Sequence, residues 1–127
     1  MVRGTAPAAT TARWVRVCAA ADLEVDVGVS ALVRGKQVAV FRTGEHEVHA
    51  VGNRDPYAGT PTMARGIVGR RDGHPYVAAP AGHQLFDLAS GEGLEHPEPS
   101  LATYDTRLVD GFVEVCVAVR TRPAPSA

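Results

Sequence analysis

Hydrophobic and polar residues alternate along short stretches of this chain, with a period of two residues. In residues 13–18 the alternation places Val15 and Val17 on one face of an expected strand, and Trp14 and Cys18 on the other. A period of two is typical of half-buried β-strands. Further strands are expected over residues 28–33, 37–42, 47–51, 104–109 and 112–119, with two more inside residues 66–80.

Turn-forming sequences separate these strands. Asp72-Gly73 and Asp110-Gly111 are strong hairpin signals, because glycine adopts positive φ at low cost. Arg34-Gly35-Lys36 and Thr43-Gly44-Glu45 are further expected turns. After the Asp110-Gly111 turn, every second residue from Val113 to Val119 is valine, which predicts a strand with one apolar face.

Helical signals are weak: only residues 19–24 are compatible with a single helical turn. Short strands with regular turns predict an all-β sandwich or small barrel. The two ends, residues 1–12 and 120–127, are rich in Ala, Pro, Ser and Thr, and we expect disordered tails there. One domain over residues 13–119 is therefore expected.

Composition narrows the function classes. The chain has 127 residues and a formal net charge of −1, so nothing favours binding to nucleic acid or to an anionic membrane. No secretory signal and no apolar stretch of membrane-spanning length is visible, and a cytoplasmic location is expected. Two cysteines, Cys18 and Cys116, are too few for a disulfide framework and are interpreted as small strand residues.

Two segments carry the clearest motif. The run "APAGHQLFDLASG" at residues 79–91 resembles the second loop of a Rieske [2Fe–2S] domain, C-P-x-H-G-x-x-F-D-x-x-x-G. In this register Ala79 stands at the Cys position and Gly82 at the His position. The run "NRDPY" at residues 53–57 resembles the first loop, with Asp55 at the Cys position and Tyr57 at the His position. The matching framework residues are Pro80, Phe86, Asp87 and Gly91.

None of these four positions holds a ligand that suits the cluster. A Rieske cluster takes two thiolates and two imidazoles, whereas alanine and glycine have no donor atom, and a carboxylate and a phenol are hard oxygen ligands. His83 lies one residue beyond the expected ligand position and does not restore the set. The resemblance therefore implies an all-β Rieske-like sandwich with a smaller loop-bearing subdomain at about residues 53–88, and without cofactor or metal in this chain.

In the order and spacing of its motifs, the chain resembles one family in particular, the small subunit of bacterial NADH-dependent nitrite reductase. The resemblance covers residues 14–119 and rests on "WVRVC", "VAVFR", "NRDPY", "ARGIVG" and "FDLASG". It implies an accessory subunit without catalytic residues of its own. Its partner would be a large subunit that carries FAD, an iron–sulfur cluster and sirohaem and reduces nitrite to ammonium.

Several side chains have both a functional and a structural interpretation. His46 and His49 have H-x-x-H spacing, but that spacing puts them on opposite faces of a strand, and we interpret both as solvent-exposed turn residues. His74 is also interpreted as a turn residue. Asp55 and Tyr57 have the chemistry of an acid/base pair, but Asp before Pro commonly starts a turn, and the tyrosine ring is suited to cap a vacant site.

Contacts with a partner are expected at the loops. Arg54, Tyr57, Arg65 and His83 are the candidate contact residues. Two other functions stay open from sequence: a Rieske-type ferredoxin that carries electrons, and a cluster-free binding or regulatory module of another oxidoreductase. Subunit stoichiometry and the choice between NADH and NADPH are also left open.

Overall fold

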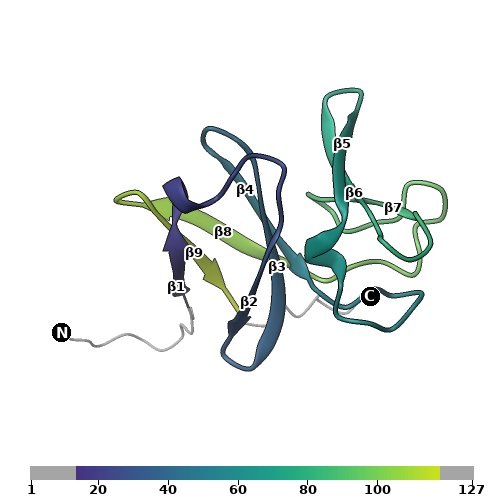
Figure 1. The fold of residues 1–127 in the computed structure, drawn as a ribbon, viewed down its shortest axis with the longest axis horizontal. Helices are drawn as coiled ribbons and strands as arrows, with labels where there is room; N and C mark the ends of the chain where they lie inside the picture. Colours follow the sequence, from purple (N-terminus) through teal and green to yellow (C-terminus); the bar gives the residue numbers. More distant parts are fainter. Residues whose placement is uncertain (1–13, 118–127) are drawn as a thin grey trace, which may run out of the picture.

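The computed structural model describes residues 14–117, so the two expected tails and Val119 lie outside the described residues. Two antiparallel sheets, one large and one small, stand side by side (Figure 1). The strands are β1 (Trp14–Ala19), β2 (Val29–Val33), β3 (Lys36–Gly44), β4 (Glu47–Gly52), β5 (Ile67–Arg71), β6 (His74–Ala78), β7 (Leu85–Asp87), β8 (Thr103–Val109) and β9 (Phe112–Cys116). Two single-turn 3₁₀ helices are η1 (Ala20–Asp22) and η2 (Met63–Arg65).

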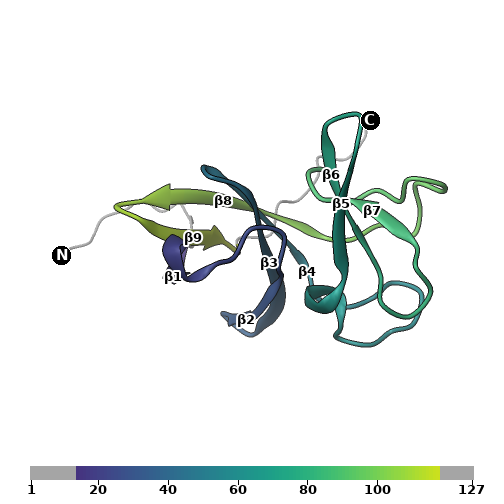
Figure 2. The same cartoon turned by 45° about the horizontal axis from the view of Figure 1, so that its top comes forward.

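The large sheet has six strands in the order β1-β9-β8-β4-β3-β2, and the small sheet has three in the order β5-β6-β7. The large sheet curls until its edge strands β1 and β2 contact each other. The segment between β7 and β8 runs around the small sheet and returns to the large one (Figure 2). The expected all-β fold with a smaller loop-bearing part is confirmed, as is the single helical turn after the first strand.

Three hairpins use the same two-residue turn. The φ angles of the paired turn residues are positive: 49° and 85° at Arg34-Gly35, 53° and 81° at Asp72-Gly73, and 53° and 82° at Asp110-Gly111. Positive φ at both positions matches the right-handed twist of the flanking strands. These three turn predictions are confirmed.

The turn between β3 and β4 was expected at residues 43–45, and that position is wrong. β3 continues to Gly44, which pairs with Glu47, so the turn falls at Glu45 and His46. The pairing shifts register between Arg42 and Gly44. The Arg42 guanidinium donates to the carbonyls of Gly44 and Glu45, at 3.2 and 3.1 Å, and so holds the extended end of the strand.

The prediction that Cys18 lies on the opposite face of β1 from Val15 is wrong, because a β-bulge interrupts the strand. Arg16 pairs with Glu114 but Cys18 pairs with Val113, so Val17 is an extra residue in β1. After the bulge, Cys18 packs against the same core as Val15, not on the opposite face. Burial raises the pKa of the Cys18 thiol, and Asp22 adds to the rise. Cys116 pairs with Trp14 at the other end of the ladder, and both cysteines are free.

The hydrophobic core has two parts that meet at β3. Val38 and Val40 point into the curled large sheet, whereas Ala39 and Phe41 pack against the small sheet. All four are fully buried. Burial of both faces explains why β3 reads as the continuous apolar run VAVF instead of an alternating one.

The outer face of β1, β9 and β8 carries a polar cluster around Glu114, a buried acidic residue. Arg107 and Arg16 bind its carboxylate at 2.8 and 3.2 Å, and their guanidinium groups lie over the rings of Trp14 and Phe112. The hydrogen bond from Arg107, followed by that from Arg16, holds the pKa of Glu114 below its ordinary value of 4.5. Both arginines are about half exposed, so each ion pair is worth little by itself.

Candidate functional site

The first loop leaves β4 at Gly52 and is fastened at its base by Asn53. This side chain is 3% exposed. Its Nδ2 donates to the Pro61 carbonyl at 3.0 Å, and its Oδ1 accepts from the Ala64 N–H at 2.8 Å. The Asn53 N–H donates to the Gln37 carbonyl at 3.1 Å. One asparagine therefore joins the start of the loop to its end and to β3.

Asp55 organises the tip of the first loop from inside. The side chain is fully buried, and its Oδ1 accepts from the N–H groups of Tyr57 and Ala58 at 2.8 and 3.1 Å. The Asp55 N–H donates to Thr60, and the Asp55 carbonyl accepts from Gly59. This is the turn-forming role expected for an Asp before Pro. The second oxygen, Oδ2, is buried without a hydrogen-bond partner among the described residues.

The second loop closes on itself around Ala79. Its N–H donates to the Gln84 carbonyl at 2.8 Å, and its carbonyl accepts from the His83 N–H at 3.0 Å. Ala79 is 1% exposed, whereas Gly82 and His83 form the exposed tip. His83 has a φ of 63°, the left-handed conformation of a tight turn.

The two loops meet at the ring of Phe86. Its centroid lies 6.2 Å from that of Tyr57, with the rings tilted by 48°. Both rings line a cavity of about 180 Å³. The rest of its lining comes from Gln84, Leu85, Gly93, Glu95 and His96. Tyr57 is 46% exposed, so it forms one rim of this cavity.

The other predicted site residues lie apart from this cavity. Arg54 is exposed and lines a groove on the flank of the first loop. Arg65 is exposed at the end of η2, outside both loops. The sequence interpretation did not assign a role to Asn53, Gln84 or His96. Asn53 belongs to the recognised motif, but its bonds depend on where the loop returns to η2.

The histidines His46 and His49 differ in their surroundings. His46 is an exposed turn residue, as expected. The prediction that His49 is also an exposed turn residue is wrong. It lies within β4 opposite Phe41, its side chain is 15% exposed, and its Nε2 is 3.5 Å from Glu47. Residues 14–117 contain no group of three or more His, Cys, Asp or Glu side chains that could hold a metal ion. No helix in that range is long and apolar enough to cross a membrane.

Comparison with known proteins agrees with this geometry. Residues 13–116 match the family of Rieske-like [2Fe-2S] domains. The nitrite reductase (NADH) small subunit of Salmonella typhimurium is 35% identical over 104 residues, which cover 81% of this chain and 96% of that protein. This chain belongs to the nitrite reductase small-subunit family.

Solved structures support the same assignment. A crystal structure from Mycobacterium tuberculosis, assigned to the NADH-dependent nitrite reductase small subunits, is 41% identical. The match covers 85% of this chain and 98% of that one, with a TM-score of 0.81. The ferredoxin of carbazole 1,9a-dioxygenase from Nocardioides aromaticivorans has a TM-score of 0.69 at 23% identity, which shows a shared fold alone.

One relative places a small-subunit-like segment inside a longer chain. The NAD(P)H nitrite reductase large subunit of Klebsiella oxytoca is 27% identical over 109 residues. These residues make up 86% of this chain but 11% of that protein. A segment similar to this chain is thus part of a polypeptide that bears the large-subunit name.

The side chains in the Rieske-like loops do not provide the ligands of a [2Fe–2S] cluster. One carboxylate oxygen of Asp55 accepts hydrogen bonds from two backbone N–H groups, and the Ala79 side chain has no atom that can bind a metal. A side chain at Gly82 would start 2.6 Å from Oε1 of Gln84, so the Gln84 amide already fills that space. Cys18 and Cys116 lie in β1 and β9 of the large sheet, outside both loops. The residues present do not fit the group.

Proposed function

We propose that this chain is the non-catalytic small subunit of an NAD(P)H-dependent nitrite reductase and works by docking on the large subunit. FAD, sirohaem and an iron–sulfur cluster would belong to the large subunit, where nitrite is reduced to ammonium. The observation that carries the proposal is a well-packed Rieske-like scaffold whose loops are held by Asn53 and Asp55, side chains whose hydrogen bonds go to backbone groups.

The Klebsiella oxytoca relative supports association of the two subunits. When a small-subunit-like segment is part of a large-subunit chain, the two parts are tethered and present in equal number. A ferredoxin-type carrier would need a redox centre in these loops, and the donor set described above does not favour one. A cytoplasmic location stays a prediction.

Nitrite reductase activity is expected only in the presence of the large subunit. The chain alone should not oxidise NADH or NADPH with nitrite, because its loops contain no positioned acid/base pair and no cluster ligand set. Co-expression with the large subunit from the same genome, followed by affinity purification through this chain, should yield a complex that reduces nitrite. A large subunit with full stability and turnover that never co-purifies with this chain would contradict the proposal.

The proposed contact surface consists of the tips of the two loops, with Arg54, Tyr57 and His83, and of Arg65 at the end of η2. All four side chains are exposed. Rigid sheets commonly present functional loops in this way. Tyrosine and arginine are also, with tryptophan, the residues enriched at interface hot spots.

Tyr57→Ala should weaken binding of the large subunit by about 30-fold, since a hot-spot truncation costs about 2 kcal/mol and each 1.4 kcal/mol is a factor of about ten. The fold should survive, because Asp55 holds the loop through the backbone and not through the tyrosine ring. Titration calorimetry or biolayer interferometry with both proteins gives the dissociation constant. Native affinity in a folded Tyr57→Ala protein would remove Tyr57 from the proposed interface.

A further inference from the structure

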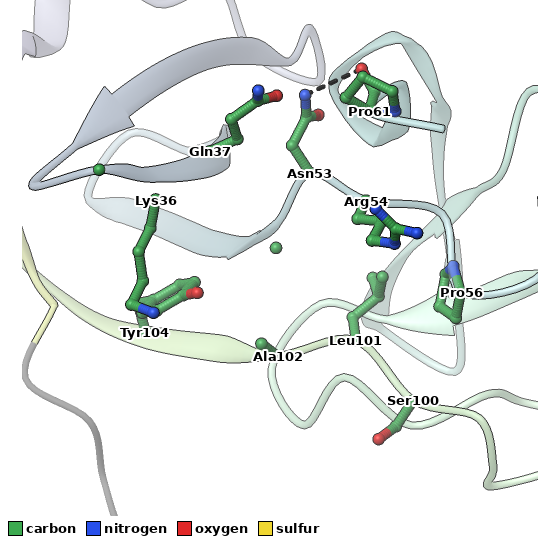
Figure 3. Close-up of a pocket in the computed structure, with 12 residues that line it drawn as sticks. Lys36, Gln37, Asn53, Arg54, Pro56, Pro61, Ser100, Leu101, Ala102 and Tyr104 are labelled. Atoms are coloured by element: carbon green, nitrogen blue, oxygen red, sulfur yellow. Dashed lines mark hydrogen bonds between the residues drawn. The ribbon is translucent and has the colours of Figure 1, made fainter. Parts of the chain in front are cut away.

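A groove of about 590 Å³ lies beside the first loop (Figure 3), and neither Tyr57 nor Phe86 belongs to its lining. Three separate segments form it: the turn that leads into β3, the end of β4 with the first loop, and the stretch that enters β8. The side chains that line it include Lys36, Gln37, Asn53, Arg54, Leu101 and Tyr104. Its volume falls within the range of ligand-binding clefts.

The charges in the groove all have one sign. Lys36 and Arg54 are its only charged lining residues, and Figure 3 shows them on opposite sides of it. Both are exposed, and neither has an acidic partner within 4.0 Å among the described residues. By contrast, Arg16, Arg70 and Arg107 each bind a carboxylate. The groove therefore presents two uncompensated cations on a protein whose net charge is −1.

The frame around these cations is built before any ligand arrives. The Gly52 N–H donates to the Ala102 carbonyl at 2.9 Å, which joins β4 to the stretch entering β8. The Asn53 N–H donates to the Gln37 carbonyl, and the Asn53 side chain holds Pro61. A preformed frame reduces the ordering cost of binding.

The ligand that such a groove recognises is an anionic one. Residues 1–13 and 118–127 contain arginines and no aspartate or glutamate. We propose that the groove docks an acidic peptide segment of the large subunit, with carboxylates of that segment bound by Lys36 and Arg54. This proposal rests on the proposed function and extends its contact surface from the loop tips to the flank of the first loop.

Charge reversal tests the groove directly. The double variant Lys36→Glu/Arg54→Glu should bind the large subunit about 100-fold more weakly, since like charges at an interface are strongly unfavourable. Arg71→Glu is the matched control: Arg71 is an exposed arginine of β5, its side chain has no ion-pair partner among the described residues, and it lies outside the groove lining. The affinity of the Arg71→Glu variant for the large subunit should stay within about threefold of that of the native chain. All variants should keep native circular dichroism, because the replaced side chains are exposed.

Cross-linking gives a second readout, because Lys36 is the only lysine in the chain. A carbodiimide joins an amine to a carboxylate as an amide, with the reagent hydrated to its urea. In the complex it should link Lys36 to an aspartate or glutamate of the large subunit, identified by mass spectrometry. Lys36→Arg should abolish this link and retain binding, since arginine keeps the charge but does not react.

The outcomes separate the two proposals. A complex that forms with the native chain, withstands the double reversal and gives no link through Lys36 would overturn the groove proposal alone. Failure of the native chain to bind the large subunit at all would overturn the proposed function, and the groove proposal with it. A Lys36 link to a second copy of this chain, seen also without large subunit, would assign the groove to self-association and overturn its role in docking.

Discussion

Replacing Phe41 by alanine is expected to lower the free energy of unfolding by about 3–5 kcal/mol, the usual cost of deleting a buried phenylalanine side chain. Phe41 is fully buried in the part of the core that joins the two sheets. The backbone approaches closely on the other side: a Cβ built on Gly28 would lie 2.6 Å from the Phe41 ring and 2.3 Å from the Ala64 carbonyl oxygen. Because the surrounding backbone is tightly packed, it cannot relax far into the cavity that the missing ring would leave. We therefore expect a loss of stability within the full range given above.

Denaturant unfolding of native and Phe41→Ala proteins measures this difference. The free energy of unfolding of a small domain is only about 5–15 kcal/mol, so the variant should unfold at a much lower denaturant concentration than the native protein. Leu32→Ala is the control, because Leu32 lies in the neighbouring strand β2 but is 73% exposed. Its effect should stay within about 0.5 kcal/mol. Equal losses in the two variants would contradict the described core.

Purified anaerobically, this chain is expected to contain neither iron nor acid-labile sulfide and to melt cooperatively without metal. The physical reason lies in the two loops. Their closing bonds come from Asn53, Asp55 and the backbone around Ala79, so the loops need no metal to hold their shape. A domain that required its metal would instead behave as an unfolded apo protein.

Iron and sulfide analysis should be combined with visible absorption and a thermal melt, with and without a chelator. The chelator should leave the melting temperature unchanged. A cluster-bearing Rieske ferredoxin, purified in parallel, shows that the preparation preserves clusters. Iron and sulfide in equal molar amounts would mean that the assignment of Asp55, Tyr57, Ala79 and Gly82 to the ligand positions is wrong, and would favour the electron-carrier function.

Local features of this fold follow closely from the sequence, and long-range ones do not. The hairpin turns at Arg34-Gly35 and Asp110-Gly111 depend on residues that adopt positive φ, and this preference acts within the turn itself. The bulge at Val17 has no such local signal, because it depends on the register with β9. The turn after β3 was misplaced for a similar reason: the Arg42 side chain extends the strand through bonds that no pattern of hydrophobic residues reveals.

The candidate site divides in the same way. Asp55 was expected to start a turn, and the structure confirms this role because the bonds it makes are to residues two and three positions ahead. The sequence motif includes Asn53 but does not predict its role, which follows from the hydrogen bonds of its side chain to Pro61 and Ala64. The small cavity beneath Tyr57 includes Gln84 from the second loop and His96 from the segment between β7 and β8, and only the folded chain brings these two residues beside Tyr57.

Features that depend on local residue types could be predicted from the sequence alone: the alternation that makes strands, most of the turns, and the lack of thiolates and imidazoles at the four ligand positions of the two Rieske-like loops. Tertiary structure alone decided what depends on packing between distant segments. β3 is buried on both faces because the curled sheet and the small sheet enclose it. Lys36, Arg54 and Tyr104 share one groove because β3, β4 and β8 bring them together. Strand pairing over such separations is set by the whole core, and no local stretch of sequence encodes it.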